Sequence, residues 1–169
     1  MEFAQKESDK LNSKVKFRTG DASDLHIFND ESFDYLVYIQ QVLCFVPKEL
    51  FNQSIKESYR IAKKGSTTLF TFLDYESRSY NPILSAISNL LRKIRGEKVS
   101  KYHLPWLKLN DTQFNWNLFG KNQPSVYWVK RREILQQLQD IGFEILEVEN
   151  GDNVAKGGNK GALYIVCRK

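Results

Sequence analysis

The sequence predicts one α/β domain in which helices pack in layers on a sheet. Segments with strand character alternate with segments of helical period along the chain, which is typical of layered α/β folds. Residues 33–39 are apolar or aromatic almost throughout, as expected of a central strand that helices cover on both faces. A chain of 169 residues with 41% apolar content is long enough for one hydrophobic core.

Composition narrows the class of protein. No run of 18 apolar residues predicts a membrane span, and the charged stretch 1–7 lacks the apolar region of a secretory signal. Cys44 and Cys167 each lie in apolar segments, which favours buried, reduced thiols in a cytoplasmic protein over a disulfide. A net charge of +5 is too small to imply nucleic acid by itself.

The first part of the chain predicts five features in order. They are an amphipathic helix over residues 1–13, a strand over Val15–Arg18, a turn at Gly20-Asp21, a strand over Phe33–Ile39, and a helix from Pro47 to about Ala62. This last helix is predicted to end at Lys63, Lys64 and Gly65. Cations suit the negative end of the helix dipole, and glycine suits a left-handed cap.

The second part predicts three strands and two helices. A β-branched and aromatic strand covers 67–73, a helix covers 83–94, and a clear helix covers 130–140 with Gly142 just past its end. Strands over 143–148 and 162–167 flank a glycine-rich connection at 157–161, which suggests an antiparallel pair at the sheet edge. Between the strand at 67–73 and the helix at 130–140 the pattern loosens over 75–125, and we interpret this segment as an inserted lid within the domain 1–169.

Three of these segments carry a family resemblance. Gly20-Asp21-Ala22 follows a predicted strand, Ser32-Phe33-Asp34 opens the next one, and Glu57-Ser58-Tyr59-Arg60 lies in the helix after it. Residues 1–74 and 126–169 together resemble class I S-adenosylmethionine-dependent methyltransferases of the type 11 kind. The resemblance implies a Rossmann-like methyltransferase sheet without its first two strands, with an inserted lid and an antiparallel C-terminal strand pair.

The resemblance also implies where ligands bind. Asp21 and Ala22 would hold the adenine of S-adenosylmethionine, since a carboxylate accepts a hydrogen bond from an exocyclic amine at the strand ends. Gln40 and Gln41 would border the methionine part of the cofactor and the substrate. A small-molecule acceptor would contact the lid through Tyr102, His103, Trp106, Trp116 and Tyr127.

Parts of the family pattern are missing. The family's glycine-rich turn and ribose-binding acid would precede Met1, and the glycines at 157–161 join two strands instead of opening a helix. Without the first two strands, Tyr35–Ile39 would keep an unpaired edge. We expect either that Val15–Arg18 pairs with this edge or that a second copy of the chain covers it as a homodimer.

No residue pattern identifies a catalytic group or a metal site. Methyl transfer needs little acid–base chemistry, because the sulfonium is already a good leaving group and positioning supplies much of the rate. His26 is expected at the surface. Gln40 and Gln41 are equally compatible with simply ending a strand. Asp74 either faces the ligand pocket or caps the next helix, and capping is the favoured interpretation. Glu57 and Arg60 lie three residues apart on one helical face and are expected to form a structural pair.

Two other functions remain open. The chain could be a non-catalytic methyltransferase-like remnant that binds a partner through its exposed edge and aromatic lid. It could also act on RNA, through a basic stretch formed by Arg92, Lys93, Arg95, Lys98 and Lys101 with Tyr102 and Trp106 nearby. A solvated helix end is the favoured interpretation of that stretch.

Overall fold

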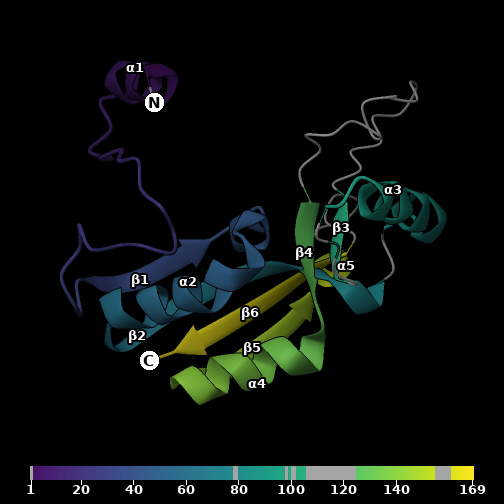
Figure 1. Ribbon diagram of the computed structural model, residues 1–169. Helices are drawn as coiled ribbons and strands as arrows, with labels where there is room; N and C mark the ends of the chain where they lie inside the picture. The colour runs from purple at the N-terminus through teal and green to yellow at the C-terminus, as the bar shows by residue number, and fades with distance from the viewer. Residues whose placement is uncertain (1, 78–79, 98, 100–101, 106–124, 155–160) are drawn as a thin grey trace.

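One long strand organises the sheet of the computed structural model, which describes residues 2–77, 80–97, 99, 102–105, 125–154 and 161–169 (Figure 1). In chain order the elements are α1 (Glu2–Lys10), β1 (Phe33–Tyr38), the 3₁₀ turn η1 (Val42–Phe45), α2 (Lys48–Ile61), β2 (Ala62–Asp74), the 3₁₀ turn η2 (Tyr75–Ser77), α3 (Pro82–Ile94), β3 (His103–Pro105), β4 (Ser125–Val129), α4 (Arg131–Ile141), β5 (Glu144–Asn150), α5 (Gly151–Val154) and β6 (Ala162–Arg168).

Strand β2 is the hub of a mixed six-stranded sheet. Along one edge it pairs antiparallel with β6, and β5 pairs antiparallel with β6 in turn. Along its other edge β2 pairs parallel with β1, and its last two residues pair with β4. This arrangement confirms the α/β prediction and the antiparallel pair formed by the last two strands.

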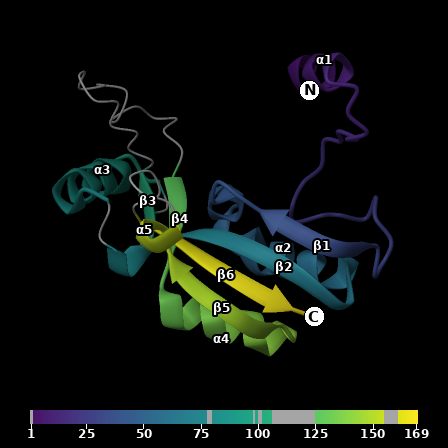
Figure 2. The same ribbon diagram turned by 180° about the vertical axis from the view of Figure 1, so that it is seen from behind.

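Helices α2 and α4 cover one face of this sheet, and both views show them on the same side (Figures 1 and 2). Phe70 and Phe72 of β2 and Ile165 of β6 are fully buried in this layer. Ile55 of α2 and Leu138 of α4 are buried in the same core cluster, from the helix side. Burying such a side chain contributes about 1.5–3 kcal/mol, so this face holds most of the hydrophobic stabilisation.

The opposite face is open in the described part of the chain. Strand side chains alternate between faces, and the register aligns Val37, Leu69 and Val166 across β1, β2 and β6. Val37 is 61% exposed and its neighbour Tyr35 is 75% exposed. The prediction that residues 33–39 are covered on both faces is therefore wrong for the described residues.

The predicted strand Val15–Arg18 is also wrong. Residues 13–20 form no strand and are exposed, on the path that leads from α1 to the carboxyl end of β1 (Figures 1 and 2). A strand needs a neighbour to complete its hydrogen bonds, and β1 pairs only with β2 among the described residues. The expectation that Val15–Arg18 covers the β1 edge fails with it.

The end of α2 differs from the prediction as well. The helix ends at Ile61, Ala62 is already extended, and Gly65 lies inside β2 with φ of +76°. The pairing of β1 with β2 jumps from Phe33↔Ala62 to Tyr35↔Thr67, so the residues between form an irregularity that glycine accommodates. Gly142, in contrast, lies just past the end of α4 as predicted, and there it adopts the left-handed conformation.

The segment proposed as a lid is described only in part. Within residues 75–125 the described elements are η2, α3 and β3, and β3 joins the sheet through β4. The helix predicted over 83–94 is confirmed by α3. Among the described residues no helix is long and apolar enough to cross a membrane.

Candidate functional site

The chain leaves β1 at the carboxyl edge of the sheet through an unusual turn. Gln40 and Gln41 both have positive φ angles, 56° and 54°. Residues other than glycine rarely adopt this backbone conformation. Thr71 of β2 stabilises this turn, because its hydroxyl accepts a hydrogen bond from the Gln41 N–H at 3.0 Å and donates one to the Tyr38 carbonyl at 2.8 Å. Backbone strain of this kind is typical of ligand-binding sites.

Asp21 forms a tight turn of its own. Its Oδ1 atom accepts hydrogen bonds from the backbone N–H and the hydroxyl of Ser23, at 2.8 and 2.7 Å. These bonds lower the pKa of the exposed Asp21 carboxyl below its ordinary value, so it is ionised at neutral pH. Ala22 is half-buried and packs against the main core.

Helix α2 holds the loop that follows this turn. The Leu25 N–H donates to Glu57 Oε2 at 2.9 Å, and Arg60 donates to the carbonyls of Leu25 and Phe28 at 3.0 and 2.9 Å. Glu57 and Arg60 are themselves paired at 2.8 Å, and the hydrogen bond from Arg60 is the main reason that the pKa of Glu57 is lowered. The predicted structural pair is confirmed, and it fixes the loop that carries Asp21.

His26 lies in this loop and is exposed, as predicted. Its ring Nδ1 is 2.7 Å from Asp24 Oδ1, in a surface pair. No group of three His, Cys, Asp or Glu side chains suited to a metal ion occurs among the described residues.

Asp74 ends β2 and is almost fully buried, with 3% of its surface exposed. Its Oδ1 atom accepts from the Glu76 N–H at 2.9 Å, which caps the turn η2 as one of the two sequence interpretations holds. Its other oxygen accepts from Arg131 at 2.8 Å, and Arg131 also donates to Asn150. These residues line a small polar cleft of about 260 Å³. The charge of Asp74 is thus already compensated by Arg131.

An aromatic cluster lies where η2, β3 and β4 meet. Tyr75 stacks on Tyr80 at 5.3 Å between ring centroids and meets Tyr102 edge-on at 5.0 Å. Trp128 contacts Tyr80 at 5.1 Å, and its buried indole N–H has no hydrogen-bond partner among the described residues. Lys130 lies 4.7 Å from the centre of the Tyr102 ring. Tyr102 is therefore one of the predicted acceptor residues, but the sequence did not point to its ring neighbours Tyr75, Tyr80 and Trp128.

The other predicted acceptor residues are not part of this ring cluster. Tyr127 makes its ring contact with Phe51 of α2, at 4.9 Å between centroids, and partial burial raises its pKa. The backbone of His103 pairs with that of Tyr127. Trp106 and Trp116 lie outside the described residues. The many aromatic residues in this part of the sequence predicted an acceptor site here. They did not indicate which rings contact one another.

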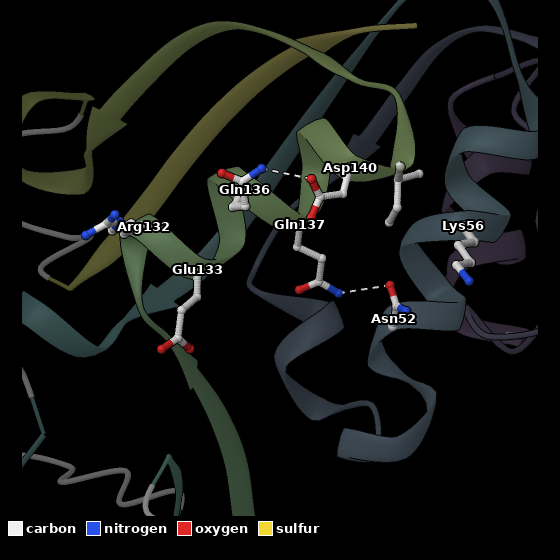
Figure 3. Close-up of a pocket in the computed structure, with 8 residues that line it drawn as sticks. Asn52, Lys56, Arg132, Glu133, Gln136, Gln137 and Asp140 are labelled. Atoms are coloured by element: carbon white, nitrogen blue, oxygen red, sulfur yellow. Dashed lines mark hydrogen bonds between the residues drawn. The ribbon is translucent and has the colours of Figure 1, made fainter.

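A further groove lies elsewhere, between α2 and α4 (Figure 3). Its volume is about 820 Å³, and Gln137 of α4 reaches across it to hydrogen-bond Asn52 of α2 at 3.1 Å. Lys56, Arg132 and Asp140 also line it. Its lining comes entirely from the helix layer, so it includes neither the Asp21 turn nor the turn after β1.

Comparison with known proteins places this geometry in context. Residues 1–70, from α1 into β2, match the family model of a methyltransferase domain. A solved S-adenosylmethionine-dependent methyltransferase from Methanosarcina mazei is 23% identical with a TM-score of 0.64, and the alignment covers 93% of this chain and 68% of that protein. Comparison with curated proteins gives no match.

Two further solved structures share the fold. A protein from Pyrococcus horikoshii is 19% identical with a TM-score of 0.59, over 98% of this chain and 64% of that protein. The 1,6-didemethyltoxoflavin-N1-methyltransferase of Burkholderia thailandensis, solved with 1,6-didemethyltoxoflavin and S-adenosylhomocysteine, is 10% identical with a TM-score of 0.60, over 98% and 56%.

These findings confirm the resemblance to class I methyltransferases. The described residues have the Rossmann-like methyltransferase fold, and residues 1–70 carry its sequence pattern. This chain spans between 56% and 68% of the length of the three solved proteins.

Proposed function

We propose that this chain binds S-adenosylmethionine at the carboxyl edge of the sheet and serves methyl transfer to a small-molecule acceptor. The match of residues 1–70 to a methyltransferase domain carries the proposal, because that stretch includes both the Asp21 turn and the strained turn after β1. Open α/β sheets bind ligands at this edge, outside the carboxyl ends of the strands.

Asp21 suits the adenine end of the cofactor. Its carboxylate is ionised and exposed, and Oδ1 is already held by Ser23. Oδ2 is then available to accept a hydrogen bond from the exocyclic amine of adenine. We assign the ring contact beside it to Ala22, as the resemblance implies.

Gln40 and Gln41 suit the methionine end. Each carries an amide that can donate and accept, so it can bind an amino group or a carboxylate. Their positive φ angles bring two consecutive amide side chains to the end of β1 while Thr71 fixes the backbone between them. This rigidity favours positioning, which is the main contribution a protein makes to an in-line methyl transfer.

The acceptor would lie against the aromatic cluster at the neighbouring end of the sheet. Tyr75, Tyr80 and Tyr102 offer apolar ring faces together with hydroxyls. In this proposal residues 75–125 act as a lid over the acceptor, with His103, Trp106, Trp116 and Tyr127 among the lid residues. The sulfur of the cofactor leaves as a neutral thioether and needs no general acid, so a base is needed only where the acceptor atom must lose a proton.

Binding of S-adenosylhomocysteine measured by calorimetry tests this proposal, with Asp21→Asn as the variant. Asn keeps an oxygen for the Ser23 hydrogen bonds but presents an amide donor where adenine needs an acceptor. We expect binding to weaken at least about tenfold, as for a lost hydrogen bond to a charged group. Asp34→Asn is the matched control, since Asp34 is an exposed carboxylate that pairs with Lys63. Equal affinity in Asp21→Asn would overturn the adenine assignment.

The second candidate is a non-catalytic protein that binds a partner. Among the described residues one face and one edge of β1 are uncovered, which favours it, and Tyr35, Val37 and Ile39 are all more than half exposed. A second copy of the chain is one possible partner. If no heat is released with millimolar S-adenosylhomocysteine while light scattering detects a dimer, this candidate replaces the first.

Both cysteines support an intracellular, reducing environment. Cys44 and Cys167 are free and buried, and burial raises the pKa of each thiol to about 12. Such thiols stay protonated and unreactive. We therefore infer a cytoplasmic location.

A further inference from the structure

Helix α3 turns its apolar side outward. Ile83, Ile87, Leu90 and Ile94 follow one another at spacings of four, three and four residues, which places them on one face of the helix. Between 43% and 73% of each side chain is exposed. Four large aliphatic side chains thus form one continuous apolar stripe that no described residue covers.

The polar side of the same helix faces the protein. Ser85 and Ser88 are buried, with 2% and 4% exposed, and their hydroxyls have no hydrogen-bond partner among the described residues. In a helix that simply coats a globular domain the apolar side faces the core. In α3 the half-buried Leu84 and Leu91 lie beside these serines, and the stripe of exposed aliphatic side chains faces away from the described residues.

Positive charges border the stripe. Lys93 is exposed at one margin of the apolar face, and the exposed Arg95 caps the carboxyl end of the helix. Arg92 turns to the other side and lies 3.6 Å from Glu97. The sequence of α3, PILSAISNLLRKI, contains no acidic residue. An apolar face with cations at its margins matches an anionic lipid surface, where the aliphatic groups enter the acyl boundary and the cations reach the phosphates.

We propose that α3 docks in the plane of an anionic lipid membrane. The helix lies at the periphery of the molecule next to β3, and no described element stands in front of it in either view (Figures 1 and 2). Nucleic acid fits less well, because the stripe is aliphatic and offers bases no ring to stack on. A second copy fits less well too, since α3 has no acidic side chain to pair with Lys93 or Arg95.

The test is flotation of the full chain with vesicles of phosphatidylcholine alone and of phosphatidylcholine mixed with phosphatidylglycerol. We expect binding to the mixed vesicles, weaker binding to neutral ones, and a decline with added salt. Leu90→Asp should reduce binding at least about tenfold, and Lys93→Glu should remove much of the preference for anionic lipid. The milder Ile94→Gln, with circular dichroism to verify the fold, covers the case in which Leu90→Asp misfolds.

Two matched controls separate α3 from the rest of the surface. Phe3→Asp removes an exposed apolar side chain from α1, which carries acidic residues, and Lys56→Glu reverses an exposed charge in the groove between α2 and α4. Neither should change vesicle binding. The proposal fails if no vesicle binds, or if Phe3→Asp weakens binding as much as Leu90→Asp. An RNA-binding surface replaces the proposal if the chain binds single-stranded RNA but no vesicles and Lys93→Glu abolishes the RNA binding. A dimer interface replaces it if the only effect of Leu90→Asp is to dissociate a dimer.

Discussion

The two faces of the sheet are built from the same strands yet differ in what covers them. On the face that α2 and α4 cover, Phe70, Phe72 and Ile165 are fully buried. On the other face Tyr35 and Val37 of β1 remain mostly exposed, although they are an aromatic and an aliphatic side chain like their covered neighbours. Residue type therefore does not distinguish the two faces, and the open face has the composition of a surface that is meant to be covered.

The largest expected effect is the loss of a side chain from the covered face. Phe70→Ala removes a ring that contacts Tyr38, Phe72 and Phe143. We expect its free energy of unfolding to fall by about 3–5 kcal/mol. Val37→Ala on the open face should cost less than about 1 kcal/mol. Urea unfolding of both variants measures the contrast, and similar losses would mean that the open face is covered in solution.

A smaller effect is expected where the loop 21–32 closes over the α2 side of β1. Glu57→Gln should lower the free energy of unfolding by about 1–3 kcal/mol near neutral pH, because charge-assisted bonds to Arg60 and Leu25 weaken. The lowered pKa of Glu57 means that its carboxylate stabilises the fold above its ordinary value of 4.5, and this contribution is lost as pH falls through the lowered pKa.

The difference between the native chain and Glu57→Gln should therefore shrink on acidification. Urea unfolding of both proteins at neutral pH and again at about pH 3 measures this difference. A gap that stays constant with pH would contradict the role given to the charge. Glu49→Gln, an exposed carboxylate at the start of α2, serves as the control.

The boundary between covered and open regions can be tested at Thr71. Thr71 follows Leu69 on the same face of β2 but is only 1% exposed, because the turn after β1 closes over it. Thr71→Val keeps the shape and removes both hydrogen bonds, so we expect a loss of about 1–3 kcal/mol in unfolding free energy. The same variant should weaken S-adenosylhomocysteine binding in calorimetry. Unchanged affinity would show that this turn does not position the cofactor.

The smallest expected effect concerns the strained turn itself. Gln41→Gly relieves a positive φ of 54° and should raise the free energy of unfolding by no more than about 1 kcal/mol. If the Gln41 amide contacts the cofactor, affinity should fall while stability rises. Thermal unfolding with and without S-adenosylhomocysteine separates these two quantities, and a parallel change in both would contradict a direct contact.

Local patterns in the sequence predicted most elements. The helices at 1–13, 47–62, 83–94 and 130–140 and the last two strands were all found, since periodicity is a property of neighbouring residues. What the pattern did not reveal is which way an apolar face points. The sequence predicts that helices cover residues 33–39 on both faces, and it gives no indication that the apolar stripe of α3 faces outward. Which side of each element is covered depends on contacts with distant segments.

The candidate site was predicted in part for the same reason. The resemblance pointed to Asp21, Ala22, Gln40 and Gln41, but glutamine carries no signal for a positive φ, so the strain at the end of β1 was not foreseen. The aromatic cluster around Tyr102 joins Tyr75 of η2 and Trp128 of β4 with Tyr80 and Tyr102, which lie just before α3 and β3. Only the pairing of those elements in space brings the rings together.

The position of β2 as hub also sets an order for folding. Its partner β1 is joined to it through α2 within one contiguous stretch, whereas β6 reaches the other edge only at the far end of the chain, where Val166 aligns with Leu69. During synthesis the β1–α2–β2 unit can therefore form early, and the second edge of β2 stays open until residues 162–168 emerge. We expect this edge to be the point at which nascent chains of this protein aggregate most readily.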